Sequence, residues 1–197
     1  FGATLVVCLL FAIFFLSIGI GLLKGRKFAW YLQVAMSILG LVGLPLGAMG
    51  GAAVLNLAAE KAQWNNKPPA GRARGIALHE SFGSIVAEVA EVSLQNGVPR
   101  VHTVVVAIDC GTVINPNTVA QQMEGAVIFG LTAALYGKID IQDGVVQQSN
   151  FPSYPMVQLA EAPLVETWIV PSTRAPGGVG EPGVPPIAPA VSNALFA

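Results

Sequence analysis

The sequence predicts an α+β fold preceded by a two-helix transmembrane hairpin, and three observations lead to this prediction. The 197-residue chain is 53% hydrophobic but only 11% charged, whereas soluble domains average about 25% charged residues. The charges are uneven, because residues 1–57 carry only three, all basic, and residues 58–197 carry seven Lys or Arg and eleven Asp or Glu. Strand-like and helix-like patterns alternate only in the second part. Two different compositions are therefore joined in one chain.

Residues 1–53 form the predicted membrane hairpin. Uncharged runs occupy residues 1–23 and 28–59, and about 20 apolar residues suffice to cross the hydrocarbon core of a bilayer. The connector at 24–27 is short and basic, with Lys24, Arg26 and Lys27. Basic loops stay on the cytoplasmic side. We therefore expect the helices to contact membrane lipid and residues 54–197 to lie in the periplasm or its equivalent.

Two other interpretations of the apolar segment remain open. Buried helices of a large soluble core would give similar runs, and residues 1–23 have the length of a signal sequence. A signal sequence begins with a basic region, however, and this chain begins at Phe1 with neither Met nor Lys beside it. That start predicts a processed or incomplete N-terminus. Pro45 predicts a kinked or shortened second helix.

The second part begins with a helix and a β-meander. A helical pattern covers residues 54–63, a strand-like pattern runs from 75 to 94 with a break near Gly83, and residues 100–108 form a Val-rich strand. Between the last two, Asn96-Gly97 is a strong hairpin signal. One face of the 75–94 stretch is expected to be buried: Val86, Ala90, Val92 and Leu94.

A long helix follows, because Asn115 is a good N-cap and Pro116 a good first helical residue. We expect it to run to about Leu135 and to bury a stripe of apolar side chains. That stripe consists of Val119, Met123, Val127 and Leu131. The remaining sequence predicts a hairpin at 138–147 around Asp143-Gly144, a strand at 165–170 and a closing helix at 185–196.

A glycine- and proline-rich loop at residues 176–186 contains a single charged residue, Glu181. Glycine lets the backbone approach a ligand closely, and the flanking prolines stiffen the loop. An ordinary surface loop has a similar composition. The functional alternative is that the loop presents one proton acceptor to a substrate or cofactor.

Several classes of site lack support in the sequence. Lys and Arg do not cluster or interleave with aromatic residues, so nucleic acid is not an expected partner. Cys8 lies in an apolar run and Cys110 in a loop, which gives no disulfide framework. His79, His102 and Cys110 lack the spacing of zinc ligands. We therefore expect no metal-ligating residues, and each His is expected to be a hydrogen-bonded or exposed strand residue.

Five motifs occur in an order that resembles a known enzyme family. They are GIALHESFG at 75–83, AIDCG at 107–111, VINP at 113–116, QMEGA at 122–126 and GVGEP at 178–182. The series resembles the molybdopterin-binding subunit of the xanthine dehydrogenase and aldehyde oxidase family, in particular its isoquinoline 1-oxidoreductase beta-subunit branch. The resemblance covers about residues 54–197 and corresponds to the C-terminal part of such a subunit, the end of its second molybdopterin-binding domain.

The resemblance implies a molybdenum–molybdopterin cofactor and hydroxylation of an aldehyde or an aromatic N-heterocycle. Glu181 matches the general base of the family, and a carboxylate suits that role because it is ionised near neutral pH. Gln122 matches the glutamine that hydrogen-bonds the pterin, although a water-facing helix position is the simpler interpretation from the residues alone. Gly178, Val179 and Gly180 would line the cofactor through backbone groups.

The sequence departs from the family pattern in two respects. The glycine-rich segments of the first molybdopterin-binding domain are absent, and two cysteines cannot ligate an iron–sulfur cluster. A partner subunit would therefore carry the clusters, the rest of the cofactor site, or both. The hairpin directly before Val54 indicates a fusion, a truncated product or a chain assembled from two sources. Two functions remain: a membrane-tethered part of a molybdenum hydroxylase, or a non-catalytic membrane-anchored structural or interaction subunit.

Overall fold

The computed structural model describes residues 45–197. Nearly all of the predicted membrane hairpin lies outside these residues. Among the helices that are described, none is long and apolar enough to span a bilayer. Residues 49–197 form one compact unit, which contains the sheet and the candidate site. The predicted boundary between residues 53 and 54 stays a prediction.

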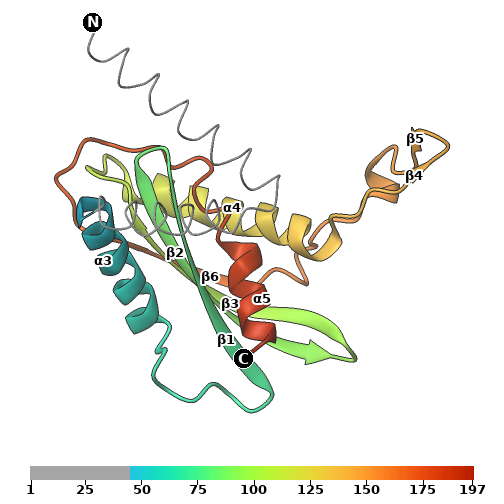
Figure 1. The fold of residues 1–197 in the computed structure, drawn as a ribbon, viewed down its shortest axis with the longest axis horizontal. Helices are drawn as coiled ribbons and strands as arrows, with labels where there is room; N and C mark the ends of the chain where they lie inside the picture. The colour runs from blue at the N-terminus through green and yellow to red at the C-terminus, as the bar shows by residue number, and fades with distance from the viewer. Residues whose placement is uncertain (1–44) are drawn as a thin grey trace, which may run out of the picture. The chain divides into compact units, whose positions relative to one another are not determined.

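A four-stranded sheet with the order β1-β2-β3-β6 forms the centre of this unit (Figure 1). Its strands are β1 (Arg72–Ser81), β2 (Ser84–Gln95), β3 (Val98–Asp109) and β6 (Leu164–Ile169). The first three form an antiparallel meander, whereas β6 pairs with β3 in parallel. A parallel neighbour requires a long crossover connection, and that crossover contains the longest helix of the unit.

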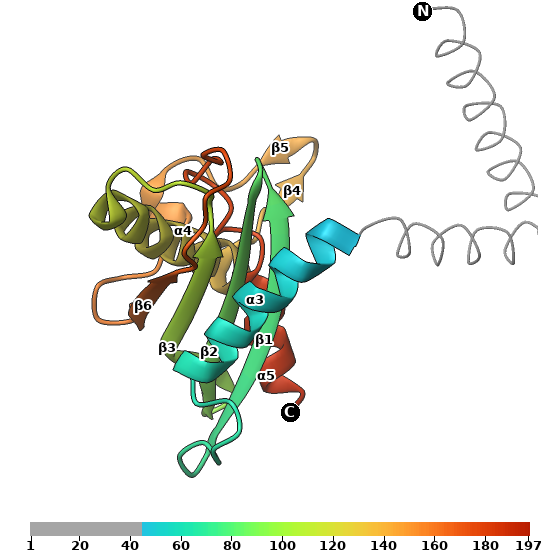
Figure 2. The same cartoon turned by 90° about the vertical axis from the view of Figure 1, so that its left-hand side faces the viewer.

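Helices cover both faces of the sheet (Figure 2). Helix α3 (Pro45–Lys61) packs on one face, and α4 (Pro116–Tyr136) and α5 (Ile187–Leu195) lie on the other. A short hairpin of β4 (Ile141–Gln142) and β5 (Val145–Val146) and a 3-10 turn at Phe151–Ser153 follow α4. The α+β class predicted from the sequence is confirmed.

Two hydrophobic clusters, one on each face, explain why most of β2 is buried. Val54 and Ala58 of α3 pack against alternate residues of β2 and β3, such as Ile85 and Val105. The intervening residues, among them Val86, pack against α4 and α5. The cluster on the α4 and α5 face also contains Ala90, Val92, Val104, Val106, Ile108, Met123, Val127, Leu131 and Ile187.

The start and the packing face of α4 confirm their predictions. The Asn115 side chain accepts hydrogen bonds from the backbone N–H of Asn117 at 3.0 Å and of Thr118 at 3.3 Å, and Pro116 is the first helical residue. The buried stripe contains all four predicted residues: Val119, Met123, Val127 and Leu131.

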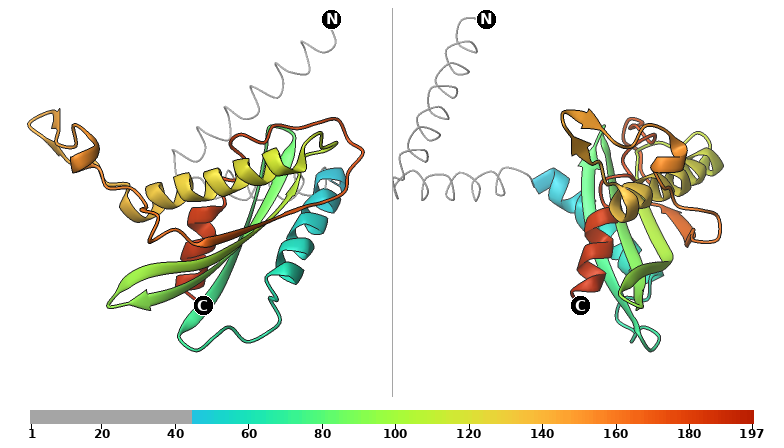
Figure 3. Two further views of the ribbon diagram at one scale, coloured as in Figure 1. Left: turned by 180° about the vertical axis from the view of Figure 1, so that it is seen from behind. Right: turned by 90° about the vertical axis from the view of Figure 1, so that its right-hand side faces the viewer.

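Leu94 differs from its prediction, because 60% of its surface is exposed. The turn end of the β2–β3 hairpin projects beyond the helices in the rear view of Figure 3, so neither cluster covers it. Helix α3 also begins earlier than the predicted residue 54, at Pro45.

Three two-residue hairpin turns share one backbone geometry but differ in their residues. Asn96-Gly97 has φ angles of 54° and 81°, and Asp143-Gly144 has 50° and 77°, as their sequences predict. The β1–β2 turn has the same signs, with 54° at Phe82 and 75° at Gly83. Phenylalanine thus stands where such turns ordinarily have Asn, Asp or Gly.

Candidate active site

The glycine-rich loop lies across the ends of the central strands and is held there by backbone hydrogen bonds. The N–H of Gly177 donates to the carbonyl of Cys110, which follows β3, at 2.8 Å. The N–H of Gly178 donates to the carbonyl of Phe82 in the β1–β2 turn, also at 2.8 Å. In return, Ser84 Oγ donates to the carbonyl of Gly178 at 2.6 Å. The loop that carries Glu181 is therefore attached at two points of the sheet.

Close packing explains why two of these loop residues are glycines. A Cβ on Gly177 would collide with Ser84 Oγ and with the carbonyl of Gly83, and a Cβ on Gly178 would lie 2.9 Å from the Cβ of Phe82. Real Cβ atoms do not approach other atoms this closely without displacement. Gly177 and Gly178 therefore let the loop contact the turn.

An ion pair fixes the beginning of the loop. Arg174 Nη2 lies 2.9 Å from Asp109 Oδ1, and the Asp109 carboxylate also accepts the N–H of Gly111 at 3.0 Å. The carbonyl of Arg174 accepts both the N–H and the Oγ1 of Thr112. Burial by itself would raise the pKa of Asp109, but the hydrogen bonds from Arg174 and Gly111 outweigh it and lower that pKa.

A pocket of about 630 Å³ lies where the loop, α4 and the β1–β2 turn meet. This volume falls within the range of pockets that bind small ligands. Three segments distant in sequence line it: His79, Ser81 and Phe82; Gln122, Gly125, Ala126 and Phe129; and Gly180, Glu181, Val184 and Pro185. The fold thus brings the predicted base Glu181 and the predicted pterin ligand Gln122 to one cavity.

Helix α4 positions Gln122 through its periodicity. The pocket-lining residues Gln122, Gly125, Ala126 and Phe129 follow the spacing i, i+3, i+4 and i+7, which places them on one face of a helix. The core stripe of α4 begins with Val119 and Met123 on the neighbouring face. Gln122 therefore faces the pocket while the helix is anchored by its apolar side.

Two features of the pocket are suited to a polar ligand that approaches the backbone closely. Ser81 is one of the residues that line the pocket, and its Oγ is buried with no hydrogen-bond partner among the described residues. A Cβ added at Gly125 or Gly180 would meet no atom within 4 Å, so the space in front of both is open. An unpaired hydroxyl and open backbone fit a cofactor that is held by hydrogen bonds. Within residues 45–197, no cluster of His, Cys, Asp and Glu could hold a metal ion by itself.

Two other predicted site residues, Gly178 and Val179, lie outside the pocket lining. Gly178 packs on Phe82, and the side chain of Val179 packs against the core on the α4 and α5 face. Neither lines the pocket. Their backbone contacts with a cofactor stay a prediction.

Sequence reasoning missed His79 and Ser81, and it treated His79 as an ordinary strand residue. Both lie on one face of β1, because residues i and i+2 of a strand point the same way. The available signal was a pair of polar residues at this spacing inside the GIALHESFG motif. Their proximity to α4 and to the loop depends on tertiary contacts that no local pattern contains.

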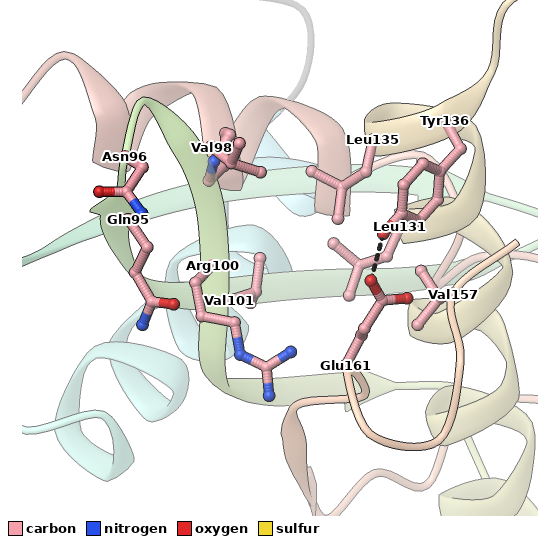
Figure 4. A pocket seen from close by; sticks show the side chains of 11 residues that line it. Gln95, Asn96, Val98, Arg100, Val101, Leu131, Leu135, Tyr136, Val157 and Glu161 are labelled. Atoms are coloured by element: carbon pink, nitrogen blue, oxygen red, sulfur yellow. Dashed lines mark hydrogen bonds between the residues drawn. The ribbon is translucent and has the colours of Figure 1, made fainter. Parts of the chain in front are cut away.

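A second pocket, of about 360 Å³, lies at the C-terminal end of α4 (Figure 4). Its polar groups already have partners: Tyr136 Oη donates to Glu161 Oε1 at 2.6 Å, and Arg100 Nη2 donates to the carbonyl of Ala160 at 3.0 Å. The N–H of Gln158 donates to Glu161 Oε2 at 2.9 Å. These bonds hold the segment after α4 against β3, which makes this pocket a structural junction.

One buried carboxyl group lies apart from both pockets. Glu88 in β2 is fully buried, and neither of its side-chain oxygens has a hydrogen-bond partner among the described residues. Its neighbours across the sheet are Ala77 and Val106. Burial raises the pKa of Glu88 well above its usual range.

Comparison with known proteins gives a consistent result. Residues 48–163 match the family model described as molybdopterin cofactor-binding domain. The chain is 36% identical over 150 residues to the beta subunit of isoquinoline 1-oxidoreductase of Brevundimonas diminuta, a match that covers 74% of this chain and 19% of that protein. It is 32% identical over 158 residues to a membrane-bound aldehyde dehydrogenase (pyrroloquinoline-quinone) of Gluconacetobacter polyoxogenes, covering 76% of this chain and 20% of that protein.

Two solved structures share the fold. CO dehydrogenase from Oligotropha carboxidovorans superposes with a TM-score of 0.53 at 24% identity, and quinoline 2-oxidoreductase from Pseudomonas putida 86 with a TM-score of 0.53 at 21% identity. Each match covers 57% of this chain and 15% of the other. The matched region spans about a fifth of the length of the Brevundimonas diminuta and Gluconacetobacter polyoxogenes relatives.

Proposed function

Because the chain belongs to the family of molybdopterin cofactor-binding domains, we propose that residues 54–197 form one wall of the active site of a hydroxylating oxidoreductase. The homologues of this chain indicate a family of molybdenum hydroxylase-type oxidoreductases. One observation carries the proposal: Glu181 and Gln122, 59 positions apart in the sequence, line the same pocket. The substrate class we propose is an aldehyde or an aromatic N-heterocycle.

Glu181 is the general base in this proposal. When bound, the molybdenum cofactor would supply the redox chemistry by taking up the two electrons that leave the hydroxylated carbon. A carboxylate of Glu181 accepts the proton released from the water-derived oxygen. Rigid attachment of the loop through Gly177 and Gly178 supports this role, because proton transfer requires the acceptor within hydrogen-bonding distance.

Gln122 and Ser81 would orient the cofactor. The amide of Gln122 offers a donor and an acceptor, and the hydroxyl of Ser81 offers one of each. Satisfying the buried Ser81 Oγ would remove the cost of an unpaired polar group, which is about 1–3 kcal/mol. The apolar side chains of Phe82, Phe129 and Val184 would exclude water from the same space.

Other parts of the enzyme would complete the site. The chain spans about a fifth of those curated relatives, and a cofactor of this size requires contacts from several segments. We propose that a partner subunit carries iron–sulfur clusters and that further molybdopterin-binding segments close the pocket. A further relative is named as one subunit of the nicotinate dehydrogenase of Pseudomonas putida, and that name supports assembly with partners.

Membrane attachment is a separate part of the proposal. Residues 1–53 would tether the domain, with the connector at 24–27 in the cytoplasm and residues 54–197 in the periplasm or its equivalent. The uncharged runs of the sequence support this. The name of the Gluconacetobacter polyoxogenes relative, which is described as membrane-bound, is compatible with it.

The molybdenum content of the complex purified through this chain tests the proposal. We expect close to one molybdenum per complex, with its loss when Gln122 is replaced by Ala and the preparation is diluted. A complex that contains the full set of partners but no molybdenum would instead favour a non-catalytic structural or interaction subunit.

A further inference from the structure

Residues 138–153, which we call the projecting arm, extend away from the sheet and its helices (Figure 1). The arm comprises the β4–β5 hairpin and the 3-10 turn at Phe151–Ser153. Exposed hydrophobic residues are normally scattered singly over a protein surface. The arm instead gathers five of them, each with 47–74% of its surface exposed: Ile139, Ile141, Val145, Val146 and Phe151. This concentration indicates a contact surface.

The arm is ordered by its own hydrogen bonds although it has no buried core. The N–H of Gln147 donates to the carbonyl of Asp140 at 2.9 Å. Asp140 and Gln148 also bond to each other twice: the N–H of Asp140 donates to Gln148 Oε1 at 2.8 Å, and Gln148 Nε2 donates to Asp140 Oδ2 at 3.1 Å. Every residue from 138 to 147 is nevertheless exposed, and an isolated two-stranded hairpin is marginally stable in water at best. The arm therefore has a defined shape that this chain does not stabilise by burial.

The hairpin presents apolar side chains on both of its faces. Ile141 is the cross-strand partner of Val146, so these two side chains share one face. Val145 precedes Val146 in the strand and points to the opposite face. A flat partner surface would cover one face only. A groove with apolar walls would cover both, which makes a groove the complementary shape.

The charges of the arm distinguish a protein groove from a lipid bilayer. The arm carries one Lys and two Asp, and Lys138 Nζ pairs with Asp140 Oδ1 at 3.1 Å. Asp143 lies in the turn at the tip, where insertion into lipid would bury its carboxylate first and at a high cost. Elements that bind membrane surfaces are rich in Lys and Arg, and the arm is not. A protein groove therefore matches the arm better than lipid does.

The place of the arm within the family domain indicates which protein provides the groove. The family match at residues 48–163 contains the whole arm, so the arm belongs to the cofactor-binding domain and is not an addition to it. About four fifths of the length of two relatives lies outside the matched region. The arm has 16 residues, fewer than the roughly 20–30 on each side of a stable interface. Contact between two arms would therefore not hold a dimer of this chain.

We propose that the projecting arm docks in an apolar groove of the molybdopterin-binding segments that lie outside this chain. The inference rests on one part of the proposed function, the completion of the site by such segments. The hairpin lies lengthwise in the groove, with Ile141 and Val146 against one wall and Val145 against the other. The turn at Asp143 stays in solvent.

Variants of the assembled enzyme, purified through this chain, test the proposal. In the double variant Ile141→Thr with Val146→Thr both residues stay β-branched, so the hairpin keeps its strand preference while its apolar face is reduced. The amount of bound molybdopterin-binding segment, identified by mass spectrometry, should fall at least about tenfold. The melting temperature of the isolated chain should stay parental, because both residues are exposed. The matched control is Leu94→Thr with Val98→Thr, two residues that are 60% and 64% exposed at the β2–β3 hairpin, and it should assemble like the parent.

Hydrogen exchange and cross-linking identify what covers the arm. The amides of residues 141–147 should exchange at least about tenfold more slowly in the complex than in the isolated chain. A photoreactive benzoylphenylalanine in place of Val145 should cross-link to a molybdopterin-binding segment. Equal exchange in both samples, parental assembly of the double variant, or an equal loss in the control would overturn the proposal. Protection of the arm by phosphatidylcholine vesicles alone, or by self-association of the chain, would show that lipid or a second copy covers it, and the proposal would be wrong.

Failure of the docking and failure of the proposed function give different results. A complex with a protected arm but no molybdenum would contradict the proposed function and leave the docking of the arm in place. A molybdenum-containing complex with an exposed arm would contradict the docking alone. A parental chain that purifies without a further molybdopterin-binding segment would overturn the docking, whatever its molybdenum content.

Discussion

Arg174 and Asp109 join the start of the glycine-rich loop to the end of β3, with 2.9 Å between Arg174 Nη2 and Asp109 Oδ1. The same Arg174 side chain also approaches the carbonyl groups of Gly83 and Asp109, each at 3.4 Å. One guanidinium group thus bridges the β1–β2 turn, the end of β3 and the loop. The position of Glu181, seven residues further along the chain, depends on this junction.

Asp109→Asn should loosen the loop. The variant keeps an acceptor for the N–H of Gly111 but loses the charge that pairs with Arg174, and we expect a loss of about 1–2 kcal/mol at pH 7. The half-exposed Arg174 keeps the loss small, because solvent screens it. Hydrogen exchange of the amides at 177 and 178 should accelerate in the variant.

The pH dependence of Asp109→Asn gives a sharper result. The folded state lowers the pKa of Asp109, so its stabilisation is present above the unfolded pKa and disappears as the pH falls through the folded pKa. Urea unfolding should therefore show a difference between parent and variant at pH 7 that shrinks as the pH falls below the unfolded pKa of about 3.9. A difference that stays constant with pH would contradict the ion pair. Asp143→Asn, in an exposed turn, is the matched control.

Glu88→Gln should stabilise the protein on the alkaline side. Burial raises the pKa of Glu88, so the stability associated with its protonated form is complete below the unfolded pKa of about 4.3 and is lost as the pH rises through the folded pKa. Thermal melts should show similar midpoints at pH 4 and a higher midpoint for the variant at pH 8, by about 2–4 °C for each kcal/mol.

Glu91→Gln is the opposite control for Glu88→Gln. Burial would raise the pKa of Glu91, but hydrogen bonds from Arg72 at 2.8 Å and Arg74 at 3.0 Å outweigh it and lower that pKa. This variant should melt at a lower temperature than the parent at pH 8. If both variants shifted the midpoint in the same direction, the assignment of a protonated Glu88 would be wrong.

Glu181→Gln should slow turnover strongly while the cofactor remains bound. The amide keeps the size and hydrogen-bonding reach of the carboxylate but cannot accept the proton, so turnover by the assembled enzyme should fall about a hundredfold to ten-thousandfold. Molybdenum content and turnover of an aromatic N-heterocycle are measured on the same sample. Glu124→Gln, on α4 but outside the pocket lining, is the control. A parental rate for Glu181→Gln would exclude Glu181 as the base.

Gly177→Ala and Gly180→Ala should separate packing from cofactor binding. The first should destabilise the fold by about 1–3 kcal/mol, because its Cβ would collide with Ser84 Oγ. The second meets open space, so its melting temperature should be parental while molybdenum retention falls. Equal destabilisation by both variants would show that the pocket is not open at Gly180.

Topology can be tested at the segment before β1. Pro68, Pro69 and Ala70 precede the sheet, and most of this stretch is exposed. If residues 54–197 lie in the periplasm, protease added to sealed spheroplasts should cut near residues 68–74. Cleavage only after lysis would reverse the proposed orientation.

Local sequence signals predicted the elements whose geometry depends on neighbouring residues. Asn115-Pro116 defined the start of α4, and Asn96-Gly97 and Asp143-Gly144 defined two turns, because capping and positive φ depend on the residues themselves. The Phe82 turn escaped prediction as a two-residue turn for the same reason, since its first residue contradicts the local preference.

Long-range contacts explain the rest. The parallel pairing of β6 with β3, the burial of both faces of β2 and the exposure of Leu94 depend on where helices pack. The pocket that Ser81, Gln122 and Glu181 line is built from three separate segments, so only the resemblance to a family indicated that Gln122 and Glu181 belong to one site. A glutamine on a helix and a glutamate in a loop are also common on protein surfaces, so the local sequence around Gln122 or Glu181 does not identify a site.

The contact between α5 and β1 has a consequence for the order of folding. Asn193 Nδ2 donates to the carbonyl of Ile76 at 2.9 Å across 117 positions, and the backbone of α5 lies directly against Gly75. Contacts of such high sequence separation form slowly, because a long loop must close first. During synthesis the β1–β2–β3 meander is complete about 80 residues before α5 emerges. The pocket cannot be complete before this stage of synthesis, because Gly180, Glu181, Val184 and Pro185, which form one of its walls, lie directly before α5 in the chain.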